Sequence, residues 1–108
     1  MTGGKAPRAR GDRFERLCMD KLRAQGYAAV RSAGSQGPAD IIALRADRLP
    51  AFIQCKVTDN TTTRQRCLFY RLAEDAGALA LLACKPANGR GVLWIRVNSE
   101  GTRSQWQI

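Results

Sequence analysis

One uninterrupted apolar segment, Ala78–Cys84, limits the folds open to this chain more than any other feature of its sequence. Its length suits a single strand, and a strand without polar positions must be covered on both faces. Apolar residues recur at helical spacing in two other segments, with Phe14, Leu17, Cys18 and Leu22 in one and Leu68, Phe69, Leu72, Ala73 and Ala76 in the other. The sequence therefore predicts a sheet with helices packed against it.

Turn formers and capping patterns divide the rest of the chain. We expect a first helix from about residue 12 to about residue 25, because Asp12 and Glu15 have the spacing of a capping box. Thr62 and Gln65 repeat that spacing before a second helix that ends at Gly77. Strands are expected at 27–31, 39–44, 49–57, 78–84 and 92–97, with a short edge strand near Trp106. This order predicts an α/β sandwich around a mixed sheet of about five strands.

A chain of 108 residues is long enough for one hydrophobic core and too short for two. Residues 1–11 are rich in Gly, Lys and Arg and carry few apolar side chains, which is typical of a flexible basic arm. We therefore expect an arm at 1–11 and a single domain at 12–108.

The charge balance favours a polyanionic partner. Eighteen Lys and Arg residues against nine Asp and Glu residues leave a formal net charge of +9. Such a surplus attracts nucleic acid, although it would also serve solubility or an association with ribosomes. Charge indicates the partner and not the chemistry.

The sequence has no histidine, and its four cysteines are too far apart to form a C-x-x-C pair. A zinc site and any histidine-based nucleophile or general base are therefore not expected. No apolar leader or membrane-length apolar run is present either, so we expect a cytoplasmic protein with free thiols that pack as small apolar residues. Carboxylates, lysine and a metal ion remain for catalysis.

Three polar residues converge in the expected hairpin. Asp40 opens one strand, and strand alternation places Gln54 and Lys56 on one face of the next. Asp40, the Gln54 side chain and the Cys55 backbone carbonyl offer oxygen ligands to a hard divalent ion, while Lys56 can position a water molecule and offset developing charge. This set suits phosphodiester cleavage. Taken alone, the same residues also fit a turn cap and the solvated side of an edge strand.

The sequence around these residues resembles the archaeal and phage Holliday junction resolvases of the PD-(D/E)XK nuclease superfamily. The matching segments are Gly11–Arg16, Gly26–Tyr27, Arg31–Leu44 and Phe52–Val57, and the likeness extends through Gln65 to about residue 84. The resemblance implies a restriction-endonuclease-like fold and an endonuclease that cuts branched DNA with Mg²⁺ or Mn²⁺.

Roles for individual residues follow from this resemblance. Asp40 matches the metal-binding aspartate, Lys56 the catalytic lysine, and Glu15 the first-helix glutamate that completes the acidic, metal-binding site. Ser32 or Ser35 matches the loop serine near the scissile phosphate. For Glu15 a simple helix cap is the competing interpretation, and for Ser35 it is turn chemistry.

The chain departs from the family's commonest pattern at one position. Gln54 stands where most members have glutamate, and the loss of a negative charge weakens the hold on a hard cation. Two alternatives therefore stay open. One is another PD-(D/E)XK endonuclease, restriction-like or repair-like, and the other is a DNA-binding module that keeps the nuclease fold with little or no catalysis.

Basic and polar residues near this site are candidates for DNA contacts. Arginines crowd the first third of the chain and are expected on the exposed side of the second helix, where they can follow phosphate backbones or simply be solvated. The candidates are Arg10, Arg13, Arg31, Ser32, Arg64, Gln65 and Arg66. Because a four-way junction has two-fold symmetry and needs two cuts, we also expect a homodimer. Leu68, Phe69 and Leu72 can face either the sheet or that partner.

Overall fold

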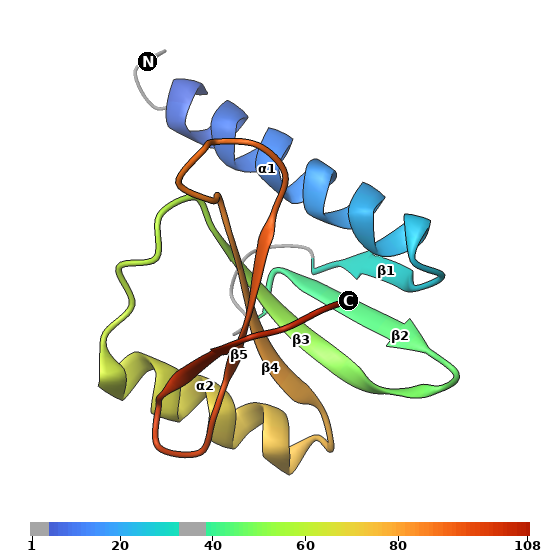
Figure 1. The fold of residues 1–108 in the computed structure, drawn as a ribbon, viewed down its shortest axis with the longest axis vertical. Coiled ribbons are helices and arrows are strands. Elements are labelled where there is room, and N and C mark those ends of the chain that lie inside the picture. Colours follow the sequence, from blue (N-terminus) through green and yellow to red (C-terminus); the bar gives the residue numbers. More distant parts are fainter. Residues whose placement is uncertain (1–4, 33–38) are drawn as a thin grey trace.

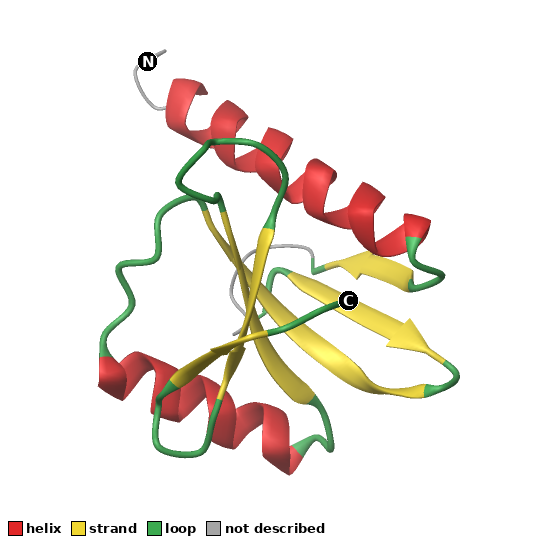
Figure 2. Ribbon diagram, in the orientation of Figure 1, coloured by secondary structure: helices red, strands yellow, loops and turns green. Residues whose placement is uncertain are grey.

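The computed structural model describes the backbone of residues 5–32 and 39–108 and the side chains of residues 11–32 and 39–108. Two helices enclose one sheet, with α1 and α2 on its opposite faces (Figures 1 and 2). The elements are α1 Lys5–Ala24, β1 Ala28–Arg31, β2 Ile41–Arg45, β3 Arg48–Lys56, α2 Thr63–Asp75, β4 Leu79–Cys84, β5 Leu93–Val97 and β6 Arg103–Gln105. No helix of the described residues has the length and apolar character needed to cross a membrane.

The strands lie in the sheet in the same order as in the chain, from β1 to β6. All neighbouring pairs are antiparallel except β3 and β4, which are parallel because α2 carries the chain back across the sheet between them. The expected mixed α/β sheet of about five strands is thus confirmed, and the short strand in the tail is its sixth member.

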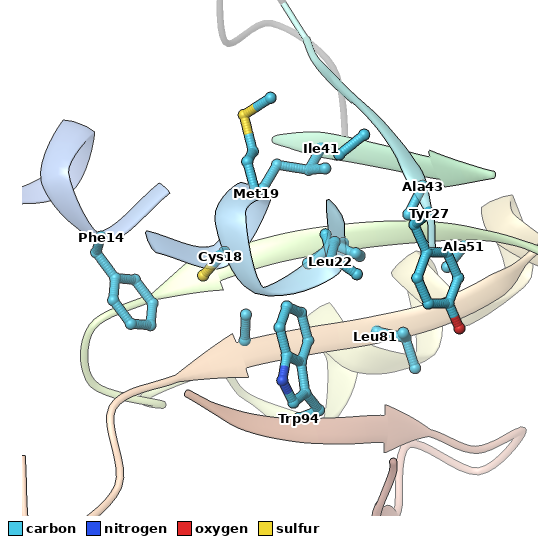
Figure 3. Packing of buried hydrophobic residues seen from close by; sticks show 13 residues of the cluster. Phe14, Cys18, Met19, Leu22, Tyr27, Ile41, Ala43, Ala51, Leu81 and Trp94 are labelled. Carbon is cyan, nitrogen blue, oxygen red and sulfur yellow. The ribbon is translucent and has the colours of Figure 1, made fainter. Parts of the chain in front are cut away.

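The two faces of the sheet carry separate apolar clusters. Side chains of α1 pack on one face, where Figure 3 shows Cys18 and Leu22 close to Leu81 and Trp94. The other face is covered by α2 through a smaller cluster that includes Phe69. Because both faces are covered, five of the six residues of β4 are buried, as its unbroken apolar sequence predicts.

Helix α1 begins at Lys5, earlier than the expected start at residue 12. Lysine, alanine and arginine have high helix propensity, and Pro7 falls in the first turn, where a backbone N–H has no partner within the helix. The interpretation of Asp12 and Glu15 as a capping box is therefore wrong, because both lie inside the helix and their carboxylates bind Arg31 instead.

The capping box expected at the second helix is present. The Thr62 hydroxyl accepts a hydrogen bond from the Gln65 backbone N–H (3.1 Å), and the Gln65 side chain accepts one from the Thr62 N–H (2.8 Å). These two bonds satisfy donors that an uncapped helix leaves unpaired. They fix the first turn of α2 close to the end of β3.

Candidate active site

Asp40 lies just before β2, and its side chain binds the backbone of β3. Its own N–H donates to the carbonyl of Ile53 (2.8 Å), and its Oδ2 accepts a hydrogen bond from the N–H of Cys55 (2.8 Å). Strand β2 begins only at Ile41, so it offers no backbone acceptor to that N–H. The carboxylate takes the place of this missing partner and is thereby bound to Cys55, the residue between Gln54 and Lys56 in the chain.

Gln54 and Lys56 share the face of β3 that turns toward α2, as strand alternation requires. Both line a cavity of about 420 Å³ between the end of β3 and the start of α2. The other lining residues are Thr61, Gln65, Leu68, Phe69 and Leu72. An amide and an ammonium group therefore meet at a hollow that is open to solvent and apolar on its helix side.

Cys55 lies between these two residues and faces the opposite way, toward α1. The neighbouring Cys18 thiol, burial and the charges of Asp40 and Glu15 raise the pKa of the Cys55 thiol far above its ordinary value. The thiol is consequently neutral and serves packing.

Glu15 is held by Arg31 and does not line the cavity of Gln54 and Lys56. Arg31 Nε donates to Glu15 Oε1 (2.7 Å), and its Nη2 donates to Asp12 Oδ1 (2.6 Å). The hydrogen bond and the charge of Glu15 raise the pKa of Arg31, with Asp12 adding to the effect. In this arrangement one guanidinium binds two of the three carboxylates of α1.

The donors near Asp40 suit a hard divalent ion that takes few protein ligands. Among the described residues, no group of three or more His, Cys, Asp or Glu side chains could enclose a metal. Magnesium, however, commonly binds through one or two carboxylates and completes its shell with water and phosphate oxygens. The Asp40 carboxylate and the Gln54 amide provide oxygen donors of that kind.

The loop before Asp40 contributes one described contact. The backbone N–H of Ser32 donates to the carbonyl of Asp40 (2.8 Å), which ties the end of β1 to the start of β2. Ser35, the other candidate for the loop serine, lies outside the described residues, as does the side chain of Arg10.

Arginines expected to contact DNA have different surroundings. Arg13 is exposed beside a cavity of about 210 Å³ that Lys85 also lines, and Arg64 is exposed on α2. Arg66, in contrast, is only 8% exposed, so its expected place on the outer side of the helix is wrong. Its position follows from the helical period, because it lies on the same side of α2 as the buried residues Phe69 and Ala73.

Three residues of the site were not singled out from the sequence. Thr61 lines the cavity, and Asp59 binds Thr61 from the same loop. Lys85 directly follows β4, and Lys56 is the last residue of the parallel strand β3, so both lysines lie at the same end of these two strands. If the parallel pairing of β3 and β4 had been expected, the lysine directly after the apolar run Ala78–Cys84 would have been predicted to lie near Lys56.

Comparisons with known proteins identify the family and the fold of the whole chain. Residues 6–106 match the family model of the archaeal Holliday junction resolvase (Hjc). Among solved structures, Hjc of Archaeoglobus fulgidus, a Holliday junction resolvase from an archaeal hyperthermophile, matches with a TM-score of 0.67 and 25% sequence identity over 88% of each chain. A search of curated proteins finds no match.

Proposed function

This chain belongs to the archaeal Holliday junction resolvase family, and we propose that it is a metal-dependent endonuclease that cuts branched DNA at four-way junctions. One observation carries the proposal above all others. The Asp40 carboxylate is fixed on the backbone of β3 between Gln54 and Lys56, which line the same open cavity. An amide and an ammonium group at a solvent-open hollow, with a carboxylate bound to the backbone of the residue between them, are suited to a phosphodiester.

A divalent ion, Mg²⁺ or Mn²⁺, would be held by Asp40 with the Gln54 amide and the Cys55 carbonyl, and would polarise the phosphate and lower the pKa of a water molecule. Asp40 contributes a carboxylate whose orientation is set by the Cys55 N–H. Glu15, which the resemblance assigns to the acidic site, would be freed to join it if Arg31 turned to a phosphate.

Lys56 is the one cationic side chain of the described residues that lines the cavity. An ammonium group there orients a water molecule and stabilises the negative charge that develops on the phosphate oxygens. Its backbone pairs with Cys84 of the buried strand β4, which fixes the base of the side chain. Lys56 therefore acts on the rate of cleavage more than on the affinity for DNA.

Exposed basic residues would bind the phosphate backbone of the DNA. Arg13 and Lys85 adjoin one hollow, and Arg64 is exposed on the first turns of α2 near Gln65. The basic segment at residues 1–11 would extend this surface. Each such contact with a phosphate adds affinity that weakens as salt concentration rises.

A homodimer would present two such sites to a junction with two-fold symmetry. Of the three apolar residues that α2 offers, Phe69 is 3% exposed and faces the sheet. Leu68 and Leu72 are 55% and 41% exposed, which leaves them available to a partner subunit. We propose that the protein works as a dimer in the cytoplasm, where the free cysteines of the described chain stay reduced.

A binding module without catalysis is the second candidate. Gln54 in place of a glutamate and the lack of a larger acidic cluster among the described residues both favour it. Such a module would hold junctions without a metal requirement and release no products.

Cleavage of a labelled four-way junction with Mg²⁺ or Mn²⁺ tests the proposal, with a matched linear duplex as the control. We expect paired nicks across the junction centre, and Asp40→Asn or Lys56→Ala should lower the rate by about 10²–10³-fold without changing the melting temperature. Equal cleavage of the linear duplex would favour a restriction-like or repair-like endonuclease. Binding without cuts under either metal would favour the inactive module.

A further inference from the structure

Arg66 is the only buried charged side chain among the described residues, and all of its nitrogens donate to the protein. Nε donates to the carbonyl of Gly101 (2.6 Å), and Nη1 donates to the carbonyl of Thr61 (2.6 Å) and to its hydroxyl (3.1 Å). Nη2 donates to the Thr63 hydroxyl (3.2 Å). One guanidinium thus joins α2, the loop after β3 and the turn between β5 and β6.

Asp59 holds the same loop from the other side. Its Oδ1 accepts hydrogen bonds from the N–H (3.1 Å) and the hydroxyl (2.6 Å) of Thr61, and its Oδ2 accepts one from Arg103 of β6 (2.6 Å). The hydroxyl of Thr61 therefore donates to a carboxylate and accepts from a guanidinium. Every polar group of Thr61 is engaged, so its place in the cavity wall is fixed.

The turn between β5 and β6 fits closely against the first turn of α2. Gly101 has a φ of 78°, which side chains disfavour, and an added Cβ would lie 3.0 Å from the Thr63 carbonyl and from the Cys67 sulfur. Arg66 and Gly101 therefore fix this turn to the helix, and Figure 1 shows it beside α2. Strand β6 and its turn form an outer support for the start of the helix.

We propose that Asp59, Arg66 and Arg103 are positioning residues for the nuclease reaction. They hold Thr61 and the first turn of α2 as the wall of the cavity opposite Lys56. The inference rests on the proposed function, because it assigns these residues an effect on cleavage. Residues 57–62 belong to no helix or strand, and without these bonds the wall would move relative to Lys56.

An electrostatic role in DNA binding is the competing interpretation of these arginines. A guanidinium that contacts a phosphate releases counterions from the DNA. The loss of such a guanidinium makes the negative slope of log K against log salt concentration shallower by about 0.9. A buried guanidinium that binds carbonyls has no such effect. Arg64, exposed two residues from Arg66 on the same helix, provides the matched comparison.

The decisive experiment measures single-turnover cleavage of a four-way junction at saturating protein, together with junction affinity across a series of salt concentrations. Arg66→Met and Arg103→Ala should lower the cleavage rate by about tenfold to a hundredfold, since small displacements in an active site cost that much. The salt slope should stay at the wild-type value in Arg66→Met, whereas Arg64→Ala should lower it by about 0.9. Arg103→Lys should recover most of the rate, because it keeps the ion pair with Asp59.

Other results overturn the inference. A lowered salt slope in Arg66→Met would show that this residue contacts phosphate, and wild-type rates in Arg66→Met, Arg103→Ala and Asp59→Asn would show that the wall needs no support. If Arg66→Met does not fold, the other two variants decide, because Arg103 is half-exposed and an asparagine side chain is close in size to the carboxylate of Asp59. A wild-type protein that binds junctions without cutting them would overturn the proposed function and this inference together.

Discussion

The two faces of strand β3 differ sharply although they belong to one segment of nine residues. On the α1 face, Ala51 and Ile53 are 3% and 0% exposed and belong to the larger apolar cluster. On the α2 face, Gln54 and Lys56 are partly exposed and line a solvent-open cavity. Because alternate residues of a strand point to opposite faces, one set of side chains serves the larger core, while the other set packs Phe52 against the α2 cluster and gives Gln54 and Lys56 to the site.

Because of this difference, we expect substitutions at different positions of the same element to affect either stability or activity. Substitutions on the α1 face should lower the free energy of unfolding and leave cleavage per folded molecule intact. Substitutions near Gln54 and Lys56 should do the reverse. A variant that changed both by similar amounts would break the comparison.

The largest expected effect on stability belongs to Leu22→Ala. Leu22 is 1% exposed in the α1 cluster, and its truncation should lower the free energy of unfolding by about 2–5 kcal/mol. Leu44→Ala, at a leucine that is 46% exposed on β2, should change it by no more than about 0.5 kcal/mol. Urea titrations of both variants measure the difference, and equal losses would contradict the assignment of the main core to the α1 face.

Gln54→Glu should sharpen the comparison on the other face. The added negative charge should lower the metal concentration for half-maximal cleavage by about tenfold, or about 1.4 kcal/mol, if the residue is a metal ligand. Gln65→Glu is the matched control, because it adds the same charge to the same cavity and glutamate also completes a capping box. Equal shifts in the two variants would show a general effect of charge and no direct ligation by residue 54.

A smaller effect is expected from Thr62→Ala, which removes the cap of α2. The loss should cost about 1 kcal/mol of stability, because the Gln65 N–H loses its acceptor. Thermal melts can compare it with Thr58→Ala, at an exposed threonine outside the helices. Identical melting temperatures for the two variants would show that the capping box contributes little to the fold.

The smallest expected effect depends on pH. Burial raises the pKa of Asp59, but hydrogen bonds from Thr61 and Arg103 outweigh it and leave the pKa below its ordinary value of 3.8. A carboxyl with a lowered pKa in the folded state stabilises the protein above its ordinary pKa, and this contribution is lost as pH falls through the lowered value. The difference in melting temperature between wild type and Asp59→Asn should therefore shrink as the pH falls below about 4. A difference that stays constant as the pH falls below about 4 would exclude this linkage.

Much of the fold could be predicted because its signals are local. The apolar run Ala78–Cys84 predicts the central strand, and the segments around Asp40 and Gln54 predict the hairpin, since each signal lies within a few residues. The start of α1 was missed because Gly11 and the charged residues before it have no apolar period, although their backbone is helical in the structure.

The site itself was only partly predictable. Strand alternation is enough to bring Gln54 and Lys56 to one face, and the capping pattern of Thr62 and Gln65 can be read from the sequence. The bond between Arg66 and Gly101 joins residues 35 positions apart and depends on a turn whose packing no local pattern specifies. The ion pairs of Arg31 were likewise not predictable from a local pattern, because its partners Asp12 and Glu15 lie on another element.

The agreement between strand order in the sheet and strand order in the chain has a consequence for synthesis. As the ribosome extends the chain, each new strand can add to an edge that already exists, and only the step from β3 to β4 requires a helix to cross the sheet. Strand β6 emerges last, and it brings Arg103 to Asp59 while the preceding turn brings Gly101 to Arg66. Under the proposed positioning role, a nascent chain acquires its cutting activity only when this final hairpin has closed.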